Sequence, residues 1–384
     1  MKLKVQPTDF IVEELTTIPI KRRGPYTLVK LTKQYWNTLD AIDYLARELK
    51  IPHQHVARAG LKDRYALSTQ YLTIKGRVLH EFHTNNIHLT PIGNTERPIS
   101  PFFLRGNRFT ITLRDCNPHE LRRIEENLPH IRTHGFVNYF DDQRFGSARH
   151  KKGFFAKALA LSHFQGALKL LLCYPYKEEG KQERHFKRFC QDHWGNWRAC
   201  YQHAPARYKK MICTLIEKPR GYKDAIKTVK RDLLNIYLLA YQSYLFNEIV
   251  REYIQTLSTD LIRIPYSMGK FVFFASVPPP EFTPGTIIPL LNEKSKIKGR
   301  IGSIVQSVMV REGIRLKDFA LRKMRFRGVR FKPSRRSLIV MPHALNAGPP
   351  QKDELYPAHK KITITFEMPP GTYATLLIKR ILAP

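Results

Sequence analysis

The spacing of apolar residues predicts short strands and helices at both ends of the chain. Residues 10–12, 27–31, 69–74 and 109–113 read as strands, and in the last of these Phe109, Ile111 and Leu113 share one face. Asn37 is a helix-capping residue, and the apolar positions 39, 42, 45, 46 and 49 that follow it recur at helical spacing. A charged surface helix is predicted at 117–131, an alternating strand at 362–366 and a last helix at 373–382.

The middle of the chain has a different pattern. Residues 154–173 and 231–253 have helical spacing, and the second stretch is apolar enough for a long buried or amphipathic helix. The strand and helix near the C-terminus are similar to the first third and not to this helical middle. The chain therefore predicts an α+β domain that is built from both ends and interrupted by a mostly helical insertion. Its length of 384 residues, too long for one ordinary core, agrees with two domains.

Charge narrows the function classes. The chain has 65 Lys and Arg against 32 Asp and Glu, a formal net charge of +33. This excess predicts a polyanionic partner, with nucleic acid as the first choice and an acidic membrane surface as the second. No apolar run approaches the ~20 residues of a membrane span, and the N-terminus lacks a secretory apolar region. Five scattered cysteines fit reduced thiols, so we expect a cytoplasmic protein.

One segment concentrates charge around a single acid. In the sequence AGLKDRYA, Asp63 lies between Lys62 and Arg64 and follows Gly60, which lets the backbone turn. Neighbouring cations favour the ionised form of a carboxylate, which a site facing RNA requires. An exposed ion pair in a loop is the simpler alternative.

A second segment, NYFDDQRFG from Asn138 to Gly146, combines an amide, aromatic rings and Arg144. Bases that leave an RNA stack are held by aromatic stacking and by hydrogen bonds to their edges. On a strand, Asn138 and Phe140 would share a face. A half-buried strand with Tyr139 and Phe145 in the core explains the segment equally well.

A possible metal pattern lies between these features and the long helix. Cys190, His193, Cys200 and His203 form C-x2-H and C-x2-H pairs, whose four ligands could hold Zn²⁺. Only six residues separate the pairs, which is short for a zinc finger, and Trp194 and Trp197 suggest an aromatic cluster instead. We expect no metal here.

Five motifs in the same order resemble the TruD family of tRNA pseudouridine synthases. Lys4 with PTDFIVEE opens the chain, followed by AGLKDR with LSTQ, NYFDDQRFG, SYLFN at 243–247 and MPPGTYAT at 368–375. The resemblance implies a mixed-sheet pseudouridine synthase core at 1–160 plus 342–384 and a TRUD-type insertion domain at 161–341. The motifs depart from the family at Asp141-Asp142 and at Tyr373, where bacterial relatives often have Phe.

The same resemblance implies roles for single residues. Asp63 falls on the catalytic aspartate and Lys4 on the lysine that pairs with it. Phe10, Asn138 and Tyr373 fall on positions that line the uridine pocket, with Phe140 next to it. Among the cations near these motifs and in nearby basic stretches, we expect RNA contacts from Arg22, Arg23, Lys62, Arg64, Arg144, Lys151 and Lys152.

The implied reaction isomerises uridine to pseudouridine in tRNA, by family default at position thirteen of the D-arm. It transfers no group and changes no oxidation state, so we expect no cofactor. The carboxylate could attack C1′ or remove the 2′ proton, and the sequence does not distinguish these. A non-catalytic RNA-binding protein or RNA chaperone that keeps the fold, and a donor-dependent RNA methyltransferase, are the alternatives. We expect a monomer, and the sequence leaves the identity of the RNA open.

Overall fold

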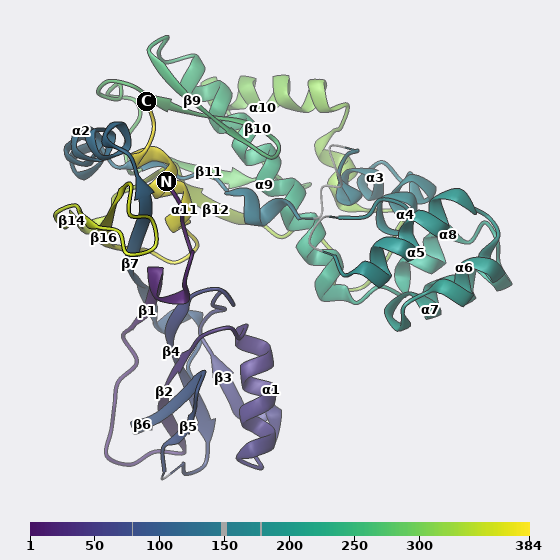
Figure 1. The fold of residues 1–384 in the computed structure, drawn as a ribbon. Coiled ribbons are helices and arrows are strands. Elements are labelled where there is room, and N and C mark those ends of the chain that lie inside the picture. The colour runs from purple at the N-terminus through teal and green to yellow at the C-terminus, as the bar shows by residue number, and fades with distance from the viewer. Residues whose placement is uncertain (79, 147–151, 177–178) are drawn as a thin grey trace. The chain divides into compact units, whose positions relative to one another are not determined.

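The computed structural model describes residues 1–384 except 79, 147–151 and 177–178 (Figure 1). The chain forms two compact units, one of residues 1–136 and 340–384 and one of residues 137–339. The first unit is therefore assembled from both ends of the chain. Within the described residues, no helix has the length and apolar character needed to cross a membrane.

A mixed sheet forms the first unit. Its strand order is β14-β16-β7-β1-β4-β2-β6-β5, with β15 beside β16 and β3 beside β4. The β1–β4 pair is parallel and the other pairs are antiparallel, which confirms the predicted α+β class with a mixed sheet. The strands are β1 (Phe10–Thr16), β2 (Tyr26–Lys33), β3 (Val56–Arg58), β4 (Leu67–Lys75), β5 (Phe82–Thr84), β6 (Ile87–Thr95), β7 (Leu104–Cys116), β14 (His343–Ala347), β15 (Gln351–Lys352) and β16 (Lys360–Met368).

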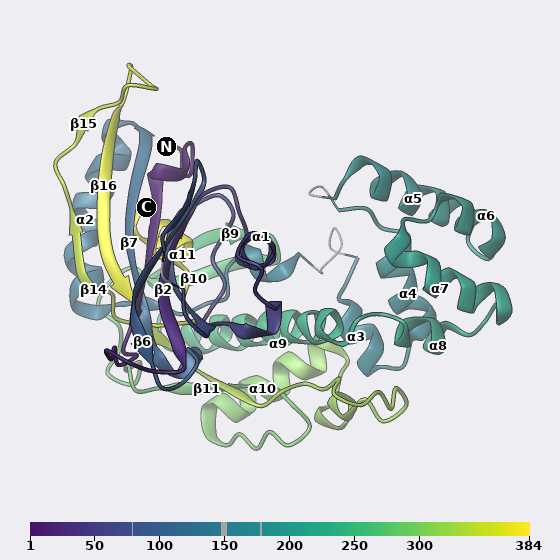
Figure 2. The same ribbon diagram turned by 90° about the horizontal axis from the view of Figure 1, so that it is seen from below.

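Helices pack on this sheet through the stripes that the sequence predicts. Asn37 caps α1 (Thr38–Glu48) by accepting a hydrogen bond from the Asp40 N–H at 2.9 Å. Ile42 and Leu45 of α1 join a buried cluster with residues of β2, β4 and β6, whereas Leu39, expected in the same stripe, is exposed. Figure 2 shows the strands side by side, with α2 (Pro118–His134) and α11 (Ala374–Ile381) in the same unit.

The second unit is mainly helical and is organised around the long helix α9 (Arg231–Gln255), which contacts α3, α10, β10 and β11. The predicted single helix at 154–173 is wrong, because Ser162 adopts a φ of 62° between α3 and α4. The other elements are α3 (Phe155–Ala160), α4 (Phe164–Leu172), α5 (Lys181–Asp192), α6 (Trp197–His203), α7 (Ala206–Glu217), α8 (Tyr222–Lys227), β9 (Leu261–Tyr266), β10 (Gly269–Phe274), β11 (Ile287–Leu290), α10 (Gly299–Glu312) and β12 (Ser334–Ser337). The short β8 (Phe136–Val137) and β13 (Ile339–Val340) lie where the chain crosses between the units.

Candidate active site

Asp63 lies in the irregular loop between β3 and β4, in the first unit. Its side chain is 49% exposed, and its Oδ2 accepts a hydrogen bond from Lys4 Nζ at 3.0 Å. The Lys4 ammonium also lies 4.1 Å from the centre of the Phe10 ring. Lys4 thus contacts both Asp63 and Phe10, with which the sequence predicts it to act, and the carboxylate stays open to solvent.

The segment that carries Lys4 is fixed by a buried ion pair. Arg114 Nε donates to both carboxylate oxygens of Asp9, at 2.8 and 3.0 Å, and both side chains are buried. The backbone of Lys2 exchanges two hydrogen bonds with that of Arg114. Lys4 itself has a φ of 57°, an uncommon conformation for a residue other than glycine. The opening motif therefore holds the Lys4 ammonium at the Asp63 loop.

The surroundings of Lys62 speak against the RNA contact that we predicted for it. Its side chain is buried, and its Nζ donates to Glu14 Oε1 and to Asn107 Oδ1, each at 2.8 Å. Its N–H donates to Thr38 Oγ1 at 2.8 Å. Glu14 is fully buried and accepts a second hydrogen bond from the Tyr71 N–H. A buried ammonium that is paired in this way is not accessible to a phosphate group. Lys62 therefore fixes the Asp63 loop to residues inside the first unit.

A second buried lysine holds the same loop from beneath. Lys33 Nζ donates to the carbonyl oxygens of Trp36, Lys62 and Asp63, at 2.7, 3.4 and 3.2 Å. Three acceptors match the three N–H bonds of an ammonium group. Burial, the largest cause, lowers the pKa of Lys33 to about 8. The negative charge of Asp63 raises this pKa, and the positive charge of Lys62 lowers it.

Aromatic rings line the sheet beside this loop. Phe10 packs edge-on against Phe109, which stacks on Phe366 of β16 with ring centres 5.2 Å apart. Tyr373 comes after the turn that follows β16 and is the residue before α11. The first unit thus holds the predicted carboxylate, its lysine partner and two of the predicted pocket aromatics.

The NYFDDQRFG segment lies in the second unit, and Arg336 of β12 is its main partner. Arg336 Nη2 donates to Asn138 Oδ1 at 2.5 Å, and its Nε donates to the Asn138 carbonyl at 2.8 Å. The guanidinium lies 4.0 Å from the centre of the Phe140 ring. Asn138 Nδ2 donates to the Ser337 carbonyl at 2.9 Å, so two neighbouring residues of β12 hold the oxygen and the nitrogen of the Asn138 amide.

The SYLFN motif supports the same segment. Asn247 of α9 accepts a hydrogen bond from the Phe140 N–H and donates one to the Phe140 carbonyl, both at 2.9 Å. Phe246 packs edge-on against the Phe140 ring. The asparagine after Phe246 in the SYLFN motif is the signal that this pairing leaves in the sequence. Its partner, however, could not be read from the sequence.

The other predicted RNA contacts have different surroundings. Arg22, Arg23, Arg64 and Lys152 are exposed. Arg64 Nε donates to the Tyr35 carbonyl at 3.0 Å, and Arg144 lies 5.6 Å from the Phe140 ring centre. Lys151 lies outside the described residues.

The cysteines of the possible zinc pattern are buried, whereas its two histidines pack on an aromatic ring. Cys190 and Cys200 are fully buried. The rings of His193 and His203 each pack on Phe189 with centres 4.0 Å apart. Over the part of the chain that the structure describes, no group of three or more His, Cys, Asp or Glu side chains is arranged to hold a metal ion.

Comparison with known proteins finds one family. The family model "tRNA pseudouridine synthase D (TruD)" matches residues 1–264 and 281–381. A Methanocaldococcus jannaschii protein described as "Probable tRNA pseudouridine synthase D 2" is 34% identical over 99% of this chain and 91% of its own length. The Methanococcus maripaludis "Probable tRNA pseudouridine synthase D 1" is 31% identical over 99% of both chains. The crystal structure of a Methanosarcina mazei chain described as a TruD protein superposes with a TM-score of 0.75, at 24% identity over 99% of this chain and 93% of that one, and supports the fold.

Proposed function

Because the chain belongs to the TruD family of tRNA pseudouridine synthases, we propose that it isomerises a uridine of tRNA, at position thirteen of the D-arm, with Asp63 as the essential group. The observation that supports this most directly is the Lys4–Asp63 pair, an accessible carboxylate held by an ammonium beside the Phe10 ring. The fixed loop around it fits a group that must meet a sugar in one orientation.

The reaction makes limited demands on the protein. The bond from N1 to C1′ of uridine breaks and a bond from C5 to C1′ forms, while C5 loses a proton and N1 gains one. Atoms and electrons balance without an oxidant or a donor group. Lys4 occupies Oδ2 of Asp63, which leaves Oδ1 to attack C1′ or to remove the 2′ proton.

The family resemblance supports four proposed residues in or next to the uridine pocket. Phe10 and Tyr373 come from the first unit, and Asn138 and Phe140 come from the second. A flipped base needs stacking surface and edge hydrogen bonds, which rings and an oriented amide supply. We propose residues 1–160 plus 342–384 as the catalytic core and 161–341 as the insertion domain, although the compact second unit begins at residue 137.

Cations near the motifs would bind the phosphates. Arg22, Arg23, Arg64, Arg144, Lys151 and Lys152 remain proposed contacts, and Lys62 does not. Phosphate contacts offset the few kcal/mol that base flipping costs. A cytoplasmic location and a monomeric state remain predictions.

Incubation of the protein with an unmodified tRNA transcript, without any additive, tests the activity. We expect nucleoside analysis to show one uridine per tRNA converted to pseudouridine. An RNA-binding protein without activity would leave every nucleoside unchanged. Modification only after addition of S-adenosylmethionine would contradict the proposal and favour a methyltransferase.

Lys33 predicts how the activity depends on pH. With a pKa of about 8, the ammonium loses a proton as the pH rises through 8, and the neutral amine can serve only two of its three carbonyl acceptors. We expect kcat, measured at saturating tRNA, to fall on the alkaline side of about pH 8.

Global unfolding would not explain this fall. Unfolded lysine keeps its proton to about pH 10.5, so the unfolded state binds more protons between pH 8 and 10.5 and this group's contribution to the free energy of unfolding rises with pH there. A Lys33→Met variant should be slow at every pH and lack the alkaline fall. A kcat that stays flat from pH 7 to 9.5 in the wild type would contradict this role.

A further inference from the structure

A cationic cavity lies in the second unit between the ribbon β11–β12 and the loop that leads into α10. It measures about 690 Å³ and is lined by Lys294, Lys296 and Lys298 on the loop and by Arg335 on β12. No Asp or Glu lines it, and none of these four cations has a carboxylate partner among the residues that the structure describes. Four uncompensated charges around one cavity predict an anionic ligand.

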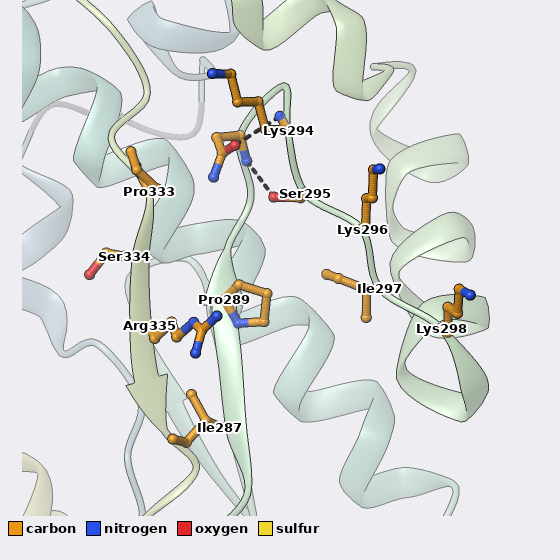
Figure 3. A pocket seen from close by; sticks show the side chains of 11 residues that line it. Ile287, Pro289, Lys294, Ser295, Lys296, Ile297, Lys298, Pro333, Ser334 and Arg335 are labelled. Atoms are coloured by element: carbon orange, nitrogen blue, oxygen red, sulfur yellow. Dashed lines mark hydrogen bonds between the residues drawn. The ribbon is translucent and has the colours of Figure 1, made fainter.

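The loop is shaped before any ligand arrives. Asn292 is buried, its Oδ1 accepts the Lys294 N–H at 2.8 Å, and its own N–H donates to Ser295 Oγ at 3.0 Å, as the dashed lines in Figure 3 show. At the other end, Gly302 allows the Ile297 carbonyl to approach α10, because a Cβ at 302 would lie 2.6 Å from that oxygen. The lysines therefore extend from a loop that is fixed at both ends.

Helix α10 adds to the positive potential. Its first turn contains no acidic residue, and Lys298 is its capping residue without a side-chain cap hydrogen bond. The free N–H groups at a helix N-terminus carry partial positive charge. The loop lysines and this helix end thus favour the same sign of ligand charge.

The arrangement suits a nucleic-acid strand better than a single small anion. In Figure 3 the three lysines follow one another along the loop, while Arg335 lies across the cavity from them. Apolar side chains of Pro289 and Ile297 lie between the two sets, and Ile287 lines the cavity below Arg335 in this view. Successive phosphates would meet successive cations, and the apolar surface would face a ribose or base.

Strand β12 connects this cavity to the proposed base-binding segment. Arg335 and Arg336 are adjacent, so their side chains leave opposite faces of the ribbon. Arg335 lines the cavity, whereas Arg336 holds Asn138 and Phe140. A nucleic-acid strand bound to Arg335 would therefore lie against β12, which also orients the proposed base-binding residues.

We propose that this cavity, formed by Lys294, Lys296, Lys298 and Arg335, binds backbone phosphates of the tRNA substrate. The proposal rests on the proposed function, since it takes tRNA as the substrate. It assigns these residues an anchoring role outside the chemistry.

The test compares two triple variants in binding to an unmodified tRNA transcript. Lys294→Gln/Lys296→Gln/Lys298→Gln removes the cavity lysines, and Lys181→Gln/Arg188→Gln/Lys210→Gln removes three exposed cations of α5 and α7 that do not line the cavity. For the cavity variant we expect the slope of log binding constant against log salt to become shallower by about 2 to 3. KM should rise roughly tenfold or more with little change in kcat. The control should keep the wild-type slope and KM.

Hydrogen exchange on the wild-type protein gives a second measurement that needs no variant. We expect tRNA to protect residues 292–298 and 333–335, and inorganic pyrophosphate to protect them only weakly. Equal binding, slope and KM in the cavity variant and the wild type, or protection by pyrophosphate that tRNA does not displace, would overturn the anchor. The salt dependence of binding and the hydrogen exchange need no turnover, so an absence of pseudouridine would count against the proposed function and not against the anchor.

Discussion

Replacement of Asp63 by asparagine is expected to lower the rate of pseudouridine formation by about 10⁴-fold or more while tRNA affinity stays within about threefold of wild type. The amide has the shape of the carboxylate and can still accept the hydrogen bond from Lys4 Nζ. The Lys33 contact uses the backbone carbonyl of residue 63 and is unaffected. Only the negative charge and the nucleophilic or basic oxygen are lost. Single-turnover conversion of an excess of enzyme over tRNA, beside a binding titration, measures both quantities.

Asp43→Asn is the matched control. Asp43 is also an exposed acid of the first unit; it lies in the middle of α1 and pairs with His53 at 3.0 Å. This variant should keep the wild-type rate. A normal rate in Asp63→Asn would show that another group performs the chemistry, and equal losses in both variants would point to a general effect of charge.

Replacement of Lys62 by methionine is expected to lower the free energy of unfolding by about 3–5 kcal/mol, because it leaves the fully buried Glu14 carboxylate without its cation. The Asp63 loop would lose its internal fixing point, so the rate should fall as well. Urea denaturation measures the stability, and the salt dependence of tRNA binding should remain that of the wild type, because Lys62 contacts no phosphate.

The double variant Glu14→Gln/Lys62→Met separates a buried pair from a missing RNA contact. Glutamine keeps an acceptor for the Tyr71 N–H and removes the unpaired charge, so most of the lost stability should return. If Lys62→Met were as stable as the wild type but bound tRNA with a shallower salt dependence, our original prediction of an RNA contact would be right after all.

The sequence allowed the fold class to be predicted because its signals are local. The Asn37 cap and the apolar stripe after it specify α1 without knowledge of the rest of the chain. The alternation at 362–366 did the same for β16, and the similarity of the two ends of the chain indicated one domain interrupted by another. These predictions depend only on spacing.

Contacts between distant segments could not be predicted in this way. Lys62 looks like its exposed neighbour Arg64 in the sequence, yet Glu14, 48 residues earlier, draws it into the interior. Lys33 could have been noticed, since it follows Leu31 by two residues on the buried face of β2. Its three carbonyl partners come from loops that the sequence does not place.

The basic run 322–336 shows the same limit. Its charge alone does not show that adjacent residues of β12 have different surroundings. Arg335 lines the cationic cavity, and Arg336 holds Asn138 and Phe140. Composition gives the charge of such a run, and only strand pairing shows which side each cation takes.

Pseudouridine mapping of RNA from cells that carry either the wild-type gene or the Asp63→Asn gene tests the central proposal most directly. We predict that position thirteen of substrate tRNAs is pseudouridine with the wild-type protein and uridine with the variant, at equal protein levels. Pseudouridine that persists at that position in the variant, with no other enzyme able to form it, would contradict the assignment of Asp63 as the reacting group.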